Sequence, residues 1–298
     1  MARSVVWIYQ PPRSGGSLLL RLFDGHPHFA VHPEPVNLRW NRRVTDEKIL
    51  DKFSMEKFRD HGFTKKSSNR HQTSVPISFD TDTFVTTYLE HRTPGDARSK
   101  YDAAQFARFR AWDDYRNATK RKRFFMLHTA MWSRMPIGRA IDNFFQIYPD
   151  GFHVFVARKP SDWLASAISL DGEPRLNDLD AALTEFNAVR TSFLSQLNER
   201  ADQRILVIHF DAMVIQPKSS LGLLCRHLDV RYRRSMRRTT INGNLTDANS
   251  THAGRSTFSP DPSLIDRGAG LHDWLQDDPR YVEAMELHRA LLQHACIR

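Results

Sequence analysis

The residues that point most clearly to chemistry lie in a short turn near the start of the chain. The turn comprises Arg13, Ser14, Gly15, Gly16, Ser17 and Leu18. Its backbone N–H groups and the positive end of the helix that follows form a cradle for an anion, because glycines let a ligand approach the backbone closely. Arg13 adds a charged fork of donors and the serines add hydroxyls. The turn is therefore predicted to bind an anionic group.

The elements around this turn predict the fold class. Four apolar segments indicate buried strands, at 4–9, 124–128, 152–157 and 204–209. Each is followed by a turn signal and a helical pattern, which is typical of an α/β protein with a parallel sheet flanked by helices. In such a sheet the turn after the first strand lies at the carboxyl edge, where ligands bind.

Between the first strand and the second, residues 41–123 are rich in charged and aromatic residues and poor in strand pattern. We predict a mostly helical insertion there. Within it, Phe106, Phe109 and Trp112 recur at helical spacing and favour an amphipathic helix over 101–115. Residues 240–263 are polar without periodicity and are predicted to form a long loop.

Composition narrows the class of protein further. The chain has 298 residues, a net charge of +9 and 40% hydrophobic residues, enough for a sizeable core. Its only cysteines, Cys225 and Cys296, cannot build a disulfide framework, which favours a reducing compartment. No apolar run approaches the ~18 residues of a membrane span and no signal peptide is recognisable, so we expect a cytoplasmic protein. The charge alone allows nucleic acid, an anionic membrane or a small anionic ligand as partner.

Two common phosphate-binding patterns do not match the turn. A Walker A loop needs a lysine beside its glycines, and a dinucleotide fingerprint needs Gly-x-Gly-x-x-Gly; residues 9–18 contain neither. This disfavours an ordinary ATP-dependent kinase and a dinucleotide oxidoreductase. An ordinary strand-to-helix turn, with Arg13 in a surface ion pair, remains an alternative for the motif taken alone.

With its flanks, the turn resembles the 5′-phosphosulfate loop of the PAPS-dependent sulfotransferases. The match consists of Pro-Arg-Ser-Gly-Gly-Ser-Leu at 12–18 and His26-Pro27 at the end of the helix. It is most similar to the branch that includes protein-tyrosine and many bacterial sulfotransferases, which reads Pro-Arg-Ser-Gly-Thr-Thr/Ser-Leu. Gly16 stands where threonine is usual, so one hydroxyl ligand is missing here.

A second motif resembles the 3′-phosphate element of the same family. Arg158 follows the third strand and Ser166 comes eight residues later, early in the next helix. An arginine at the sheet edge and a serine in the first turns of a helix can reach one phosphate. A third stretch, 207–213, resembles the family's Val-x-Tyr-Glu-Asp-Leu strand end, but with His209 in place of tyrosine. A nucleotide contact and a plain core histidine both remain open for His209.

The resemblance implies a sulfotransferase that moves a sulfuryl group from PAPS to a hydroxyl or amine by in-line displacement and releases PAP. It implies that Arg13 and the N–H groups of 14–18 stabilise the departing phosphate, that Arg158 and Ser166 bind the 3′-phosphate, and that no metal is needed. Counting from His26-Pro27 makes Glu34 the general base, with His32 and His128 as rival bases. The acceptor is expected to be a small molecule, carbohydrate or peptide.

The resulting expectation is one P-loop-like α/β domain over 1–298, with the insertion 41–123 covering the acceptor pocket. The alternatives are a nucleotide-dependent kinase on a similar core, a non-catalytic nucleotide- or nucleic-acid-binding protein, and an inactive family member. Nucleic acid is disfavoured because no recognition module appears. Two basic clusters lie at 120–123 and 231–238, and both are expected to be solvated. The alternative for the second cluster is that it folds over the nucleotide together with 240–263 and Arg255 or Arg267. The oligomeric state is not predicted.

Overall fold

The computed structural model describes most of the chain. The described residues are 3–32, 38–53, 79–111, 122–130, 137–168, 179–200, 204–241, 244–245, 260, 262 and 265–295.

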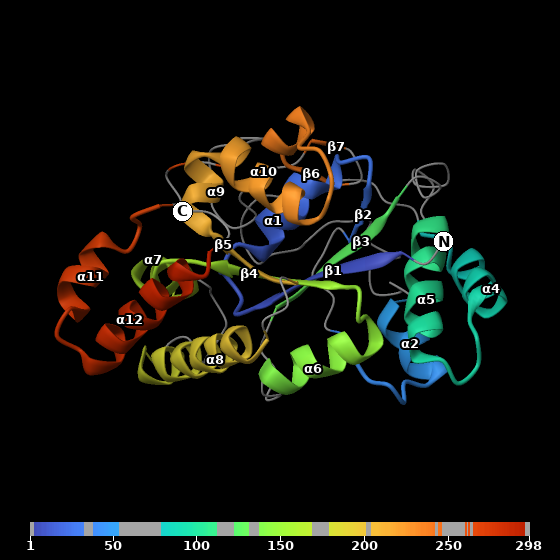
Figure 1. The fold of residues 1–298 in the computed structure, drawn as a ribbon, viewed down its shortest axis with the longest axis horizontal. Coiled ribbons are helices and arrows are strands. Elements are labelled where there is room, and N and C mark those ends of the chain that lie inside the picture. Colours follow the sequence, from blue (N-terminus) through green and yellow to red (C-terminus); the bar gives the residue numbers. More distant parts are fainter. Residues whose placement is uncertain are drawn as a thin grey trace.

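A five-stranded, all-parallel sheet forms the centre of the molecule (Figure 1). Its strands are β1 (Ser4–Gln10), β2 (Phe29–Val31), β3 (Phe124–Ala130), β4 (Phe152–Ala157) and β5 (Ile205–His209), in the order β2-β3-β1-β4-β5. The predicted α/β fold with a parallel sheet is confirmed. Strand β2 was not predicted, because three residues give too little pattern to recognise.

Helices cover both faces of the sheet because the strand residues alternate between two apolar cores. Val6 and Ile8 pack on one face with α1 (Gly16–Asp24), α9 (Phe210–Ile215) and α10 (Pro217–His227). Val5, Trp7 and Tyr9 pack on the other with α6 (Ile137–Ile147) and α8 (Leu179–Glu199). A third cluster joins α8 to α7 (Pro160–Ile168), α11 (Ala269–Leu275) and α12 (Pro279–Gln293). None of the described helices is long and apolar enough to cross a membrane.

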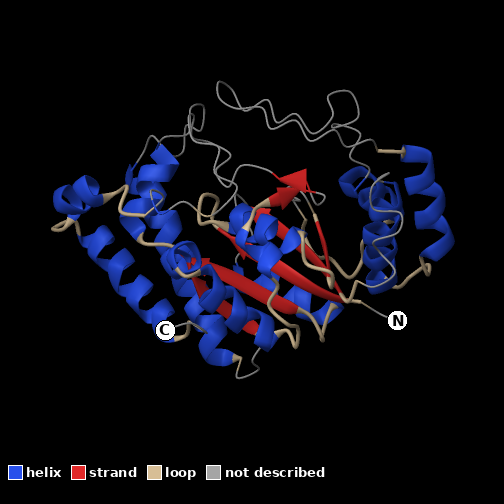
Figure 2. Ribbon diagram, turned by 90° about the horizontal axis from the view of Figure 1, so that it is seen from above, coloured by secondary structure: helices blue, strands red, loops and turns tan. Residues whose placement is uncertain are grey.

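In the part of 41–123 that the structure describes, the helices are α2 (Asp46–Phe53), α4 (Thr81–His91) and α5 (Ala97–Ala111). The helix predicted over 101–115 corresponds to α5, which begins earlier, at Ala97; residues 112–115 lie outside the described part. These helices lie at one end of the sheet and α11 and α12 at the other (Figures 1 and 2).

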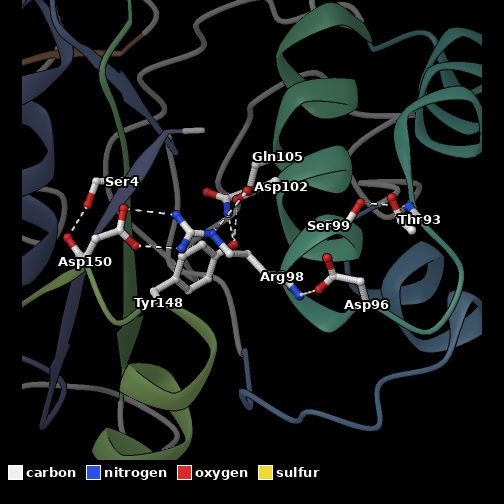
Figure 3. Close-up of polar contacts among 9 residues, drawn as sticks. All are labelled: Ser4, Thr93, Asp96, Arg98, Ser99, Asp102, Gln105, Tyr148 and Asp150. Atoms are coloured by element: carbon white, nitrogen blue, oxygen red, sulfur yellow. Dashed lines mark hydrogen bonds and ion pairs between the residues drawn. The ribbon is translucent and has the colours of Figure 1, made fainter. Parts of the chain in front are cut away.

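Polar contacts fasten α5 to the amino edge of the sheet, the edge opposite the turn 13–18 (Figure 3). The Arg98 guanidinium pairs with both Asp150 carboxylate oxygens, at 2.8 and 3.0 Å. The Tyr148 hydroxyl donates to Asp102 Oδ1 at 2.8 Å, and Ser4 Oγ donates to the Asp150 carbonyl at 2.6 Å. These contacts join the insertion to the start of β1 and to the turn before β4.

The expectation of one long loop over 240–263 is wrong at its start. There β6 (Thr240–Ile241) and β7 (Asn244–Leu245) form an antiparallel pair. Tertiary contacts hold it: Thr240 Oγ1 donates to Asp24 Oδ2 at 2.7 Å and Ile241 is buried. Two-residue strands carry no periodicity that a sequence pattern could reveal.

The basic cluster 231–238 lies at the far end of α1 from the turn. It contains the 3₁₀ helix η4 (Arg234–Arg237), and Ser235 Oγ donates to the carbonyl of Gly25, the C-cap residue of α1. Its position does not fit the idea that this cluster covers a nucleotide bound at the turn.

Candidate active site

The turn between β1 and α1 has a left-handed backbone at two positions. Arg13 has φ 68° and Gly15, the N-cap of α1, has φ 104°. A non-glycine residue at positive φ is uncommon, and such strain concentrates at functional sites. At Gly15 a side chain is also excluded by space, because a Cβ there would lie 2.5 Å from the Phe210 ring. The backbone thus curls into the predicted cradle, with Gly16 as the first residue of α1.

The two predicted phosphate motifs meet at this turn. Arg13 Nε donates to Ser166 Oγ at 3.1 Å and to the Ser166 carbonyl at 3.2 Å. Arg158 Nη1 donates to the Arg13 carbonyl at 2.8 Å. Trp163, on the same helix as Ser166, donates its indole N–H to the Pro12 carbonyl at 2.8 Å. Residues about 145 positions apart in the sequence therefore form one site at the carboxyl edge of the sheet.

The site concentrates buried positive charge. Burial, and then the nearby charge of Arg267, lower the pKa of Arg13 to about 10. The pKa of Arg158 is also lowered to about 10, first by burial and further by Arg13 and Arg267, against the opposing effect of Asp162. Both guanidinium groups therefore stay charged at neutral pH. Cations that disfavour one another's charge at close range are matched to a ligand that carries several negative charges.

Arg267 is brought to the site by an anchored segment, 265–268. Asp162 on α7 accepts hydrogen bonds from the backbone N–H groups of Asp266, at 3.1 Å, and Gly268, at 2.9 Å. Gly268 has no room for a side chain, because a Cβ would lie 2.2 Å from the Ser161 backbone. Arg267 was one of two arginines predicted to cover the nucleotide; the other, Arg255, lies outside the described residues. In the sequence, the glycine that follows Arg267 was the available signal that this segment packs closely.

The other residues predicted to bind the donor belong to the turn and the start of α1. Ser14 is 2% exposed, Gly16 is buried, and Ser17 and Leu18 belong to the first turn of α1. Glu34, the predicted base, lies outside the described residues.

Of the rival bases, His32 has a partner that limits its chemistry. Its Nδ1 accepts a hydrogen bond from Arg108 Nη1 at 2.7 Å, and burial holds the pKa of the ring well below its usual value. A neutral ring whose Nδ1 accepts carries its proton on Nε2, and so has no second lone pair for an acceptor's proton. His32 is a poor candidate for the base. His128 lies with its ring directly against Gly16.

Two further histidines have structural partners. His26 Nδ1 accepts a hydrogen bond from the His28 backbone N–H at 3.2 Å, and His26 Nε2 lies 2.9 Å from the Arg231 carbonyl oxygen. The two contacts hold the chain just after α1 in place. His209 Nε2 lies 3.5 Å from Asp211 Oδ2. Burial lowers the pKa of His209 and raises that of Asp211.

A parallel sheet with an arginine-bearing anion cradle at its carboxyl edge defines a P-loop-like α/β protein.

Comparison with known proteins places the chain within that class. The model of the sulfotransferase family matches residues 6–234. The chain therefore belongs to the sulfotransferase family, and its chemistry is sulfuryl transfer.

Two solved structures share the fold at low sequence identity. The sulfotransferase domain of the Synechococcus PCC 7002 olefin synthase has a TM-score of 0.56 at 15% identity, covering 98% of this chain and 96% of that one. The sulfotransferase domain from the curacin biosynthetic pathway has a TM-score of 0.52 at 14% identity, covering 97% and 98%. A search of curated protein sequences found no significant match.

Proposed function

We propose that this protein is a PAPS-dependent sulfotransferase that sulfates a hydroxyl or amine of a small-molecule, carbohydrate or peptide acceptor. The observation that carries the proposal is the junction of the two motifs, in which Arg13 contacts Ser166 and Arg158 contacts Arg13. A donor with phosphate groups at both the 5′ and 3′ positions needs two anion sites side by side, and we assign these to the turn and to Arg158 with Ser166 on α7.

The residues present fit such a donor. The turn has a left-handed backbone at Arg13 and Gly15, and the arginines are buried and charged. Arg13 and the N–H groups of 14–18 would bind the 5′-phosphosulfate, while Arg158 and Ser166, with Arg267, would bind the 3′-phosphate. PAPS would supply the sulfuryl group and leave as PAP when the acceptor displaces it in line.

The chain's contribution is position and charge. Arg13 and the helix N-terminus would stabilise the negative charge that grows on the departing phosphate, and preorganised donors of this kind are each worth about 10²–10³ in rate. The acceptor loses its proton to a general base, for which Glu34 remains our proposal; it follows β2 in the sequence by three residues. A positioned carboxylate base contributes about 10²–10⁴.

The test is ligand-dependent thermal stability. PAP at about 100 times its dissociation constant should stabilise the folded protein by about 2.7 kcal/mol, whereas ATP and ADP should not. Arg200→Ala is a suitable control variant, because it removes a guanidinium that pairs with Asp142 outside the site. Stabilisation by ATP without any by PAP would overturn the donor assignment in favour of a kinase. Steeply salt-dependent binding of nucleic acid without PAP binding would favour the nucleic-acid alternative.

The acceptor can then be sought with a PAPS-coupled screen of phenolic, carbohydrate, lipid and peptide hydroxyls. We propose that the insertion 41–123 covers the acceptor pocket, since it is the part of the chain that the donor motifs do not use.

A further inference from the structure

The end of β1 carries a buried amide whose donor faces the anion cradle. Gln10 is the last residue of β1 and is fully buried. Its Oε1 accepts a hydrogen bond from the Val156 backbone N–H at 2.8 Å, which fixes the orientation of the amide. Within the described part of the chain, its Nε2 has no hydrogen-bond acceptor. A buried donor held in place without an acceptor is costly, so it points to a partner that arrives with a ligand.

The position of Gly16 shows which way the Nε2 donor of Gln10 points. A Cβ built on Gly16 would lie 2.7 Å from Gln10 Nε2 and 2.5 Å from His128 Nε2. Both polar groups therefore occupy the space beside the first residue of α1, where a side chain at position 16 would stand. Gly16 begins an ordinary helix and does not have a left-handed backbone, so glycine is required here for space and not for conformation.

The surroundings indicate the kind of ligand. The space adjoins the N-terminus of a nine-residue helix, which favours negative charge, and the turn that carries Arg13. An amide N–H and an imidazole are short-range hydrogen-bond partners for an oxyanion. A threonine at position 16 would have offered one hydroxyl; this chain offers two buried groups from β1 and β3 in its place.

We infer that Gln10 and His128 are ligands of the phosphosulfate group of the donor, and that Gly16 is glycine in order to admit them. The inference rests on the proposed function, because the same turn must bind the donor. It assigns a direct contact with the donor to two residues outside the turn itself.

The first test separates donor binding from packing. Gln10→Glu keeps the side-chain length and an oxygen for the Val156 N–H, but replaces the amide donor with an anionic acceptor. We expect the dissociation constants for PAPS or PAP, measured by calorimetry at pH 8, to rise at least tenfold, with a melting temperature close to that of the wild type. Unchanged affinity for both nucleotides would overturn the inference.

A matched pair of variants controls for the loss of a buried amide. Gln10→Met and Gln105→Met each remove a fully buried glutamine, but Gln105 lies on α5, where its Nε2 donates to the Tyr148 hydroxyl. Only Gln10→Met should weaken PAPS binding. Equal affinities in the two variants would contradict the assignment even if Gln10→Glu did not fold.

The second test uses the space at Gly16. Gly16→Ala should weaken PAPS binding, because its Cβ would displace both polar groups. If His128 only packs there, His128→Ala in the same chain should relieve its clash with the new Cβ and recover affinity relative to Gly16→Ala; if His128 is a ligand, the double variant should stay at least tenfold weaker than the wild type. A wild-type protein that binds neither PAPS nor PAP would overturn the proposed function together with this inference. Wild-type affinity in the double variant would overturn the inference alone.

Discussion

Arg13 and Arg158 touch each other through one backbone carbonyl, yet we expect their removal to have different effects. Arg13→Ala should lower the rate of sulfuryl transfer by about 10²–10³, because its charge stabilises the departing phosphate. Arg158→Ala should chiefly weaken PAP binding, by about tenfold or more, because it removes a charged hydrogen-bond donor. Single-turnover rates and calorimetric PAP affinities distinguish the two. The same loss of rate and affinity in both variants would show that the two arginines do not have separate roles in transfer and in PAP binding.

For the proposed base, Glu34→Gln should reduce turnover by about 10² or more while PAP affinity stays within about twofold of the wild type. The amide keeps the size of the carboxylate and cannot accept the acceptor's proton. The measurement is kcat with saturating PAPS alongside PAP binding. Wild-type turnover would remove Glu34 from the mechanism.

At the scale of elements, helix α7 contacts each of the segments that make up the candidate site. It carries Ser166, which Arg13 contacts, Trp163, which holds the Pro12 carbonyl, and Asp162, which holds the segment 265–268. One short helix thus joins the turn after β1 to the last third of the chain, and its position decides whether the arginines face one ligand.

We expect Asp162→Asn to weaken PAP binding about tenfold, although Asp162 itself is not proposed to contact the nucleotide. Asparagine keeps one acceptor oxygen but loses the second, and it loses the charge that favours protonated Arg158. Asp266→Asn is the matched control, because it removes only an exposed carboxylate paired with Lys159 at 3.3 Å. PAP titrations of both variants check this. Equal affinities would mean that the anchor does not position Arg267.

The elements also show where sequence reasoning succeeds. The turn and the strand ends were predictable because glycines, an arginine and buried strands follow one another at fixed spacing. The convergence of Arg13 with Arg158 followed from parallel topology, which brings strand ends to one edge. What escaped depends on tertiary contacts: β2 and the pair β6–β7 are too short to have a period, and Gln10 reads in the sequence as one more strand residue. Only the packed structure shows that its amide faces Gly16.

At the scale of the molecule, stability should depend on Asp102, at the edge of the sheet remote from the site. It lines a cavity of about 490 Å³ with Arg3, Phe106 and Phe125, and burial raises its pKa to about 6, above the usual value of 3.8. The folded state therefore binds more protons than the unfolded state between these values, and the free energy of unfolding falls as pH rises through that window.

Between pH 4 and pH 7, the free energy of unfolding of the wild type should fall by about 1–3 kcal/mol relative to that of Asp102→Asn. Urea unfolding of both proteins at the two pH values measures this difference. Asparagine keeps an oxygen for the Tyr148 hydroxyl and does not titrate, so its curve should be flatter over this range. PAP affinity serves as the internal control and should not change. Parallel stability curves would show that Asp102 has an ordinary pKa.

The parallel pairing of β1 also sets an order of assembly during synthesis. Ser4 pairs with Phe124 and Val6 with Phe152, so during synthesis β1 waits for more than a hundred further residues before it has either neighbour. The turn 13–18 is made early, but its partners on α7 and then the segment 265–268 emerge much later. A nascent chain that stops short of these elements carries the turn without the residues that complete the proposed site.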